Sequence, residues 1–140
     1  MSELMEIESA PTQTKLQWID ICNTEDLIEN TGICAVLPHF QSGKLHDFFE
    51  QLALFYLPRK AQVYVLSNWD PIGKANVMYR GIIGSIQDEP MVASPLYKQH
   101  FSLETGQCFE QNDIGLTVYR SRIFNAKVQI TLDTYARDGQ

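Results

Sequence analysis

Two short segments of the chain carry polar side chains at spacings that suit an iron–sulfur cluster. Asn68 and Asp70 are separated by one residue, and Ser94 and Tyr97, roughly 25 residues further on, are separated by two. Loops of the type C-x-H and C-x-x-H hold a [2Fe–2S] cluster at this spacing, because two thiolates bind one iron ion and two imidazoles bind the other. The spacing alone therefore indicates a redox-active cluster.

The side chains at these positions are not cluster ligands. They offer oxygen or amide groups, whereas iron ions bridged by sulfide require thiolate or imidazole groups. Cys108 and His100 lie near by in the sequence but cannot replace two cysteines and two histidines. The sequence therefore predicts no cluster, and it predicts four vacated ligand positions, which are Asn68, Asp70, Ser94 and Tyr97.

The framework around the second segment is nevertheless kept. The second loop of a Rieske domain usually reads C-P-x-H-G-x-x-F-x-L-x-T-G, and here the chain reads S-P-L-Y-K-Q-H-F-S-L-E-T-G from Ser94 to Gly106. The matching residues are Pro95, Phe101, Leu103, Thr105 and Gly106. The chain thus resembles a Rieske domain, which implies an all-β fold of antiparallel strands.

The elements that would position these loops also indicate an all-β domain. Short runs of β-branched and aromatic residues alternate with turn residues, as expected for antiparallel hairpins. A single helical turn is expected after the first strand, capped by Asn23 or Thr24. The predicted strands are 16–21, 33–37, 52–57, 62–68, 81–86, 90–94, 100–103, 107–110, 116–124 and 128–132, and the strand at 33–37 is expected to be buried.

One region is ambiguous by pattern. The apolar residues Leu45, Phe48, Phe49 and Leu52 recur at helical spacing, so a helix over about 44–56 is possible. We predict a short helix or an irregular insertion over 38–50 and a strand from 52.

The composition points to one globular domain with flexible ends. The chain has 140 residues and a net charge of −6, so phosphate backbones and anionic membranes are unfavourable partners. Residues 1–15 and 133–140 are expected to be tails around a domain over 16–132. The three cysteines, Cys22, Cys34 and Cys108, suggest free thiols packed as small core residues in a reducing, cytoplasmic setting.

A wider set of motifs resembles the small subunit of the assimilatory NAD(P)H-dependent nitrite reductase. They are QWIDIC, NTGICAVL (30–37), NWDP (68–71), YRG (79–81) and VASPLYKQHFSLETGQC (92–108). The resemblance spans roughly residues 16–132 and implies an antiparallel Rieske-like β-sandwich with a loop-bearing subdomain over about 66–110. The longer connection over 38–50 departs from it.

The resemblance implies an accessory role in the reduction of nitrite to ammonium during nitrate assimilation. In that family the large subunit carries FAD, an iron–sulfur cluster and siroheme. This chain has no G-x-G-x-x-G dinucleotide motif and no set of four cysteines, so we expect no cofactor, no metal and no catalytic residue on it. The expected partner is the large subunit, with no nucleic acid and no membrane.

The two loops are candidates for the contact with that partner. In a Rieske domain they form an exposed tip, and tryptophan and tyrosine are frequent interface anchors. The simpler interpretation is structural: Asn68 and Asp70 start a turn before Pro71, and Ser94 and Tyr97 hydrogen-bond each other or nearby backbone. The candidate interface consists of Asn68, Trp69, Asp70, Tyr97, Lys98, Gln99 and His100.

Two other functions remain open from the sequence. The chain could be a cluster-less Rieske-like interaction module that serves another oxidoreductase. A genuine Rieske-type electron-transfer ferredoxin is the third alternative, which iron and acid-labile sulfide in the purified protein would reveal.

Overall fold

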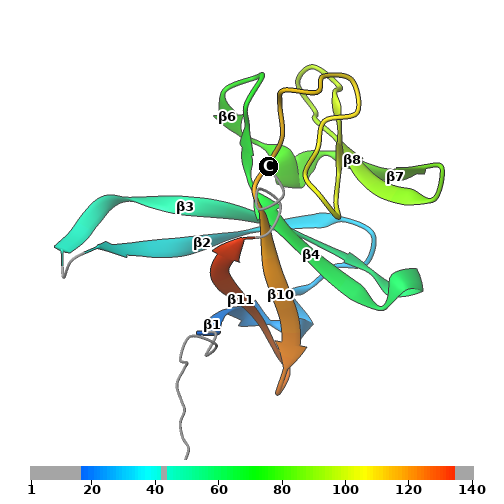
Figure 1. Ribbon diagram of the computed structural model, residues 1–140. Helices are drawn as coiled ribbons and strands as arrows, with labels where there is room; N and C mark the ends of the chain where they lie inside the picture. Colours follow the sequence, from blue (N-terminus) through cyan, green and yellow to red (C-terminus); the bar gives the residue numbers. More distant parts are fainter. Residues whose placement is uncertain (1–16, 42–43, 135–140) are drawn as a thin grey trace, which may run out of the picture.

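The computed structural model describes residues 17–41 and 44–134 of the chain. In this part of the chain, strands and short 3-10 turns are the only regular elements, so the prediction of an all-β fold is confirmed. Figure 1 shows a larger sheet in the lower part of the molecule and a smaller, loop-rich part above it. The two predicted tails lie outside the described residues, except that the last strand continues to Thr134.

The larger sheet has six antiparallel strands in the order β1-β11-β10-β4-β3-β2. All six strands contribute to one apolar cluster that includes Leu52, Leu54, Val65, Val128 and Ile130, so the sheet curls around this cluster. The strands are β1 (Ile19–Asn23), β2 (Gly32–Gln41), β3 (Lys44–Leu57), β4 (Gln62–Ser67), β10 (Val118–Phe124) and β11 (Lys127–Thr134).

The region 38–50 is strand, so the prediction of a helix or irregular insertion there is wrong. β2 and β3 form a long hairpin in which Phe40 pairs with Leu45 and Gln41 with Lys44. Further along β3, alternate side chains enter two different cores: Ala53 and Phe55 face one, and Leu52 and Leu54 the other. The prediction over 38–50 failed because a strand there depends on the pairing of β2 with β3, which the periodicity of a single segment does not reveal.

The second strand is less buried than its composition suggested. Leu37 is buried, but Val36 is 52% exposed and the thiol-bearing residue Cys34 is also exposed. The prediction of a strand over 33–37 is therefore confirmed, but the prediction that it is buried is wrong. The strand is exposed because β2 lies at the edge of the sheet, with β3 as its only neighbour there.

The remaining hairpins form where turn residues interrupt the chain. β3 and β4 are joined by the 3-10 turn Pro58–Lys60, and β10 and β11 by Asn125 and Ala126, both with positive φ. The expected helical turn after β1 is the 3-10 helix Thr24–Asp26, where the backbone N–H of Asn23 donates to Asp26 Oδ2 at 2.9 Å. The predictions of these two hairpins and of the helical turn are confirmed. The predicted strand over 107–110 is wrong, because residues 107 and 108 form only isolated β-bridges.

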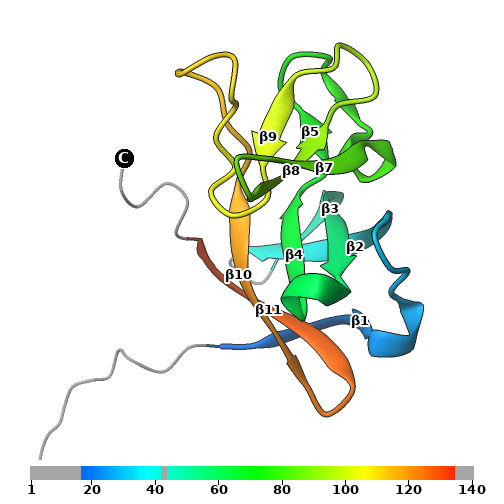
Figure 2. The ribbon, with the colours of Figure 1, turned by 90° about the vertical axis from the view of Figure 1, so that its right-hand side faces the viewer.

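The smaller part consists of two small sheets and the loops between them (Figure 2). It packs on the larger sheet through a shared core, in which Phe55 and Leu66 of the larger sheet meet Val92 and Phe101 of the smaller part. Its elements are β5 (Trp69–Asp70), β6 (Ala75–Asn76), the 3-10 turn Met78–Arg80, β7 (Ile82–Ile86), β8 (Glu89–Ala93) and β9 (His100–Ser102).

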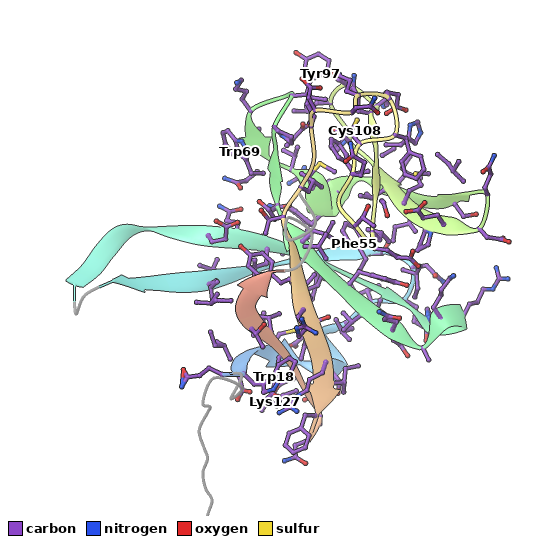
Figure 3. The ribbon with its side chains drawn as sticks, in the orientation of Figure 1. Trp18, Phe55, Trp69, Tyr97, Cys108 and Lys127 are labelled. Carbon is purple, nitrogen blue, oxygen red and sulfur yellow. The ribbon has the colours of Figure 1, made fainter. Side chains whose placement is uncertain are left out.

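The opposite end of the molecule carries a stacked cation. The guanidinium carbon of Arg122 lies 4.2 Å from the ring centroid of Trp18 and 4.5 Å from that of Phe124. Arg122 Nε also donates to Gln129 Oε1 at 2.7 Å. The stack ties the start of the described chain to the β10–β11 hairpin, far from the loops (Figure 3).

Candidate functional site

Asp70 organises the first loop. The loop is a tight hairpin in which β5 and β6 pair and Asp70 stands just before the turn. Asp70 Oδ1 accepts hydrogen bonds from the backbone N–H groups of Ile72 at 2.9 Å and Gly73 at 3.0 Å. This is the side-chain–backbone turn expected for an aspartate before proline, so the structural interpretation of Asp70 is confirmed.

Ser94 joins the second loop to the first. Its hydroxyl group donates to Asp70 Oδ2, and both residues are buried, with Asp70 0% and Ser94 1% exposed. Ser94 Oγ also accepts the backbone N–H of Leu96 at 3.1 Å. Two of the four vacated ligand positions are thus bound directly to each other across the loops. The alternative that Ser94 bonds nearby backbone is therefore confirmed, whereas a direct pair with Tyr97, which is 62% exposed, is not observed.

Asn68 fastens the base of the first loop to the larger sheet. Its Oδ1 accepts the backbone N–H of Tyr79 at 2.7 Å, and its Nδ2 donates to Gln51 Oε1 at 3.2 Å. The same amide nitrogen lies 3.7 Å from the sulfur of Cys34. Asn68 is 0% exposed, so its polar atoms serve the interior of the protein.

These four positions do not fit a [2Fe–2S] cluster. The side chains of Asp70 and Ser94 occupy the space between the loops with their own hydrogen bond. Asn68 is committed to backbone and side-chain partners, and Tyr97 is largely exposed to solvent. None of the four offers thiolate or imidazole. Within the described residues, no group of three or more His, Cys, Asp or Glu side chains is placed to hold a metal ion.

The cysteines do not provide a replacement. All three are free, and burial raises the pKa of each thiol, which opposes formation of the thiolate that a metal or cluster would need. The prediction of free thiols is confirmed. Cys108 is a buried core residue, but Cys34 is exposed, so the core assignment is wrong for that residue.

The exposed tip of the loops is smaller than the candidate interface. Asn68 and Asp70 were included in it, but both are fully buried, which removes them as contact residues. Trp69 is 44% exposed and Tyr97 62% exposed, and Figure 3 shows both at the end of the molecule opposite Trp18. Lys98 is exposed and Gln99 half-buried.

One tip residue escaped sequence analysis. Leu96 is 45% exposed and lies against Gly73, where a Cβ atom would come within 2.5 Å of Leu96 Cδ1. This contact brings the two loops together on the outside, above the buried Asp70–Ser94 bond. The sequence places Leu96 between two vacated ligand positions, and therefore at the tip. The ligand spacing, however, identifies only the neighbouring positions Ser94 and Tyr97.

His100 lies at the side of the tip and is held by Glu110. Its Nδ1 is 2.5 Å from Glu110 Oε2, and its backbone N–H donates to Glu110 Oε1 at 2.9 Å. Burial opposes ionisation of Glu110, but the two hydrogen bonds from His100 outweigh it and lower the pKa of that carboxyl group. Because its ring has an intramolecular partner, His100 is less available for contact than the exposed tip residues.

Comparison with known proteins agrees with the fold and the loops. The sequence profile of the Rieske-like [2Fe–2S] domain matches residues 17–131. The chain therefore belongs to the Rieske-like domain family. It is 38% identical over 114 residues to the nitrite reductase (NADH) small subunit of Escherichia coli K12, covering 81% of this chain and 96% of that protein. Within these Rieske-like proteins, the chain belongs to the family of nitrite reductase (NADH) small subunits.

Two further similarities bear on the assignment. The solution structure of the E. coli protein NirD superposes with a TM-score of 0.68 at 37% identity, covering 85% of this chain and 99% of that one. A nitrite reductase [NAD(P)H] large subunit from Klebsiella oxytoca contains a segment 31% identical over 123 residues, which is 88% of this chain and 12% of that protein. In the described part of the chain, no helix is long and apolar enough to cross a membrane.

Proposed function

We propose that this chain is a non-catalytic, cofactor-free subunit that docks on the large subunit of a cytoplasmic NADH nitrite reductase. The large subunit would carry FAD, an iron–sulfur cluster and siroheme, and would reduce nitrite to ammonium in nitrate assimilation. The three free thiols support the cytoplasmic location, since reducing compartments keep cysteines unpaired.

The observation that carries the partner is the Klebsiella protein. There, a domain 31% identical to this chain is part of the large-subunit polypeptide itself. Covalent attachment places such a domain next to the rest of that large subunit. This separate chain would form the same assembly by binding its large subunit non-covalently.

The donor set of the loops supports a role without electron transfer through this chain. Where a cluster would need four ligands, the loops are closed by the Asp70–Ser94 hydrogen bond and the Asp70-centred turn. Such a network holds backbone in place but has no accessible redox state. The chain would therefore act by shape and contact, stabilising the large subunit or ordering its cofactor-binding loops.

The tip is the surface we assign to this contact. Trp69, Leu96 and Tyr97 present exposed apolar area, and Lys74 and Lys98 are exposed cations in the same two loops. Over 68–76 and 94–99, the segments that form the tip, the one acidic side chain is Asp70, which is buried and hydrogen-bonded. A cationic, aromatic tip on a chain of net charge −6 is suited to an acidic, partly apolar patch of the partner.

Binding of the purified large subunit tests this proposal. Wild-type chain is expected to bind it and to raise its nitrite-reduction rate or its thermal stability. Tyr97→Ala combined with Lys98→Ala is expected to weaken binding at least tenfold, because interface aromatic residues often contribute more than 1 kcal/mol each. Ile123→Ala is the control, since Ile123 is 46% exposed at the opposite end of the molecule.

Three results would contradict the proposal in different ways. If wild-type chain fails to bind the large subunit but captures another oxidoreductase, the interaction module is correct. Equal binding by the tip variant and the control would remove the tip as the docking surface. Stoichiometric iron and acid-labile sulfide in the purified chain would identify a Rieske-type ferredoxin.

A further inference from the structure

The smaller three-stranded sheet has one covered edge and one open edge. Its strands are ordered β7-β8-β9. The outer edge of β9 is covered by the following segment, with backbone hydrogen bonds from Ser102 N to Gln107 O at 3.0 Å and from Phe109 N to His100 O at 2.8 Å. Across the described residues, the outer edge of β7 receives no comparable backbone hydrogen bond. An unpaired edge is a template for another strand.

The register of the β7–β8 hairpin identifies the outward groups. The two turn residues, Gln87 and Asp88, both have positive φ, as in a two-residue type I′ turn closed by a hydrogen-bonded pair, here Ile86 and Glu89. Hydrogen-bonded and non-hydrogen-bonded pairs alternate along an antiparallel ladder. Ser85, which pairs with proline, and Ile83 therefore direct their backbone N–H and C=O groups away from β8.

An open groove lies beside the β7–β8 hairpin. Ile83, Gly84 and Ser85 line one side of a cavity of about 410 Å³, and Leu57 and Pro90 add apolar surface to it. Strands pair about 4.8 Å apart, and each extended residue advances the chain about 3.3 Å. A groove of this volume accommodates a short extended segment of a few residues beside β7.

The far wall of the groove is basic. Arg59 and Lys60 lie in the turn between β3 and β4 and line the groove. Both are exposed, and neither makes a hydrogen bond or ion pair with any described residue. Asp88 lies at the end of the groove formed by the hairpin turn. The charged side chains of the lining are thus two cations and one exposed carboxylate, so the groove carries a net positive charge in a chain of net charge −6.

We infer that β7 is a strand-addition site, at which an extended acidic segment of the large subunit pairs with the outward groups of Ile83 and Ser85 and places acidic side chains against Arg59 and Lys60. This inference rests on the proposed partnership with the large subunit but not on the tip. Backbone pairing would supply affinity, and the basic wall would select the sequence of the segment.

Hydrogen exchange of the backbone amides in the complex tests the inference. The amides of Ile83 and Ser85 are expected to exchange at least tenfold more slowly in the complex than in the free chain. The amide of Gly84, which already pairs with Met91, is expected to be protected in both states. Unchanged exchange at Ile83 and Ser85 in a complex that forms would overturn the strand-addition site and leave the proposed function standing.

Two variants give an independent readout by titration with the large subunit. Ser85→Pro removes an outward donor and is expected to weaken binding about tenfold. Arg59→Glu combined with Lys60→Glu leaves the strand intact and is expected to weaken binding and reduce its salt dependence. The control Lys127→Glu, at the opposite end of the molecule, is expected to bind with wild-type affinity. Wild-type affinity in the Arg59/Lys60 variant would show that these two cations do not bind the partner segment, which would overturn this part of the inference. Failure of wild-type chain to bind the large subunit would overturn both this inference and the proposed function.

Discussion

Replacing Asp70 by alanine is expected to destabilise the two loops together. The carboxylate accepts three hydrogen bonds, from the backbone N–H groups of Ile72 and Gly73 and from the hydroxyl group of Ser94. In Asp70→Ala, all three donors lose their acceptor. Ile72 and Gly73 are half-buried and can be reached by water, but Ser94 is 1% exposed and is left unsatisfied in the interior.

The magnitude follows from the kind of bond that is lost. Hydrogen bonds to charged groups contribute about 1.5–3 kcal/mol each, and bonds that share one acceptor are not additive. We therefore expect Asp70→Ala to lower the free energy of unfolding by about 3 kcal/mol. Asp70→Asn keeps the Oδ1 acceptor and can still pair with Ser94, so its expected cost is about 1 kcal/mol.

Urea denaturation followed by tryptophan fluorescence measures the difference, because Trp69 is adjacent to Asp70 in the chain. With a slope of about 1.5 kcal/mol per M, Asp70→Ala should shift the midpoint by about 2 M. Asp113→Ala is the control, since Asp113 is exposed and its cost should stay within about 0.5 kcal/mol. A loss below about 1 kcal/mol in Asp70→Ala, or an equal loss in Asp70→Asn, would refute the reasoning.

Three further predictions concern other parts of the molecule. Gly106→Ala should cost about 3 kcal/mol or more in urea denaturation, because Gly106 has φ of 82° and an added Cβ would lie 2.0 Å from the carbonyl oxygen of Leu116. Glu110→Gln should lower stability at neutral pH by less than about 1 kcal/mol, since the pair with His100 is solvent-exposed. Because the pKa of Glu110 is lowered in the folded state, this difference should be full above the ordinary value of 4.5 and vanish as the pH falls through the lowered pKa, which acid titration of both proteins would show. Arg122→Lys should cost about 1 kcal/mol in thermal unfolding, because lysine cannot stack between the two aromatic rings as a planar guanidinium does.

The hairpins could be predicted because their signals are local. Residues that accept positive φ, such as Asn125, mark the turns, and runs of β-branched residues lie on either side. Each such signal is contained within about ten residues of sequence, so it does not depend on the rest of the fold.

The long β2–β3 hairpin could not be recognised in the same way. Leu45, Phe48 and Phe49 lie at spacings that suit a helix, and nothing local distinguishes that pattern from a strand. The deciding interaction over 44–50 is the pairing with β2, as between Leu45 and Phe40, because β4 pairs with β3 only from Leu52 onward. Pairing between two segments is not contained in the periodicity of either one.

The candidate site was predicted in position but not in exposure. Ligand spacing located the two loops and showed that thiolates and imidazoles are missing. It could not show that Asn68 and Asp70 point inward, because their partners Gln51, Tyr79 and Ser94 come from other elements. Burial of a polar side chain depends on such distant partners, which a single sequence does not reveal.

The bond between Asp70 and Ser94 also bears on biogenesis. Every atom that closes this end of the protein is supplied during translation, so maturation would require neither iron, nor sulfide, nor a dedicated assembly pathway. Newly made chains would reach their final shape in air or under iron starvation, and denatured chains would regain it in the presence of a strong chelator.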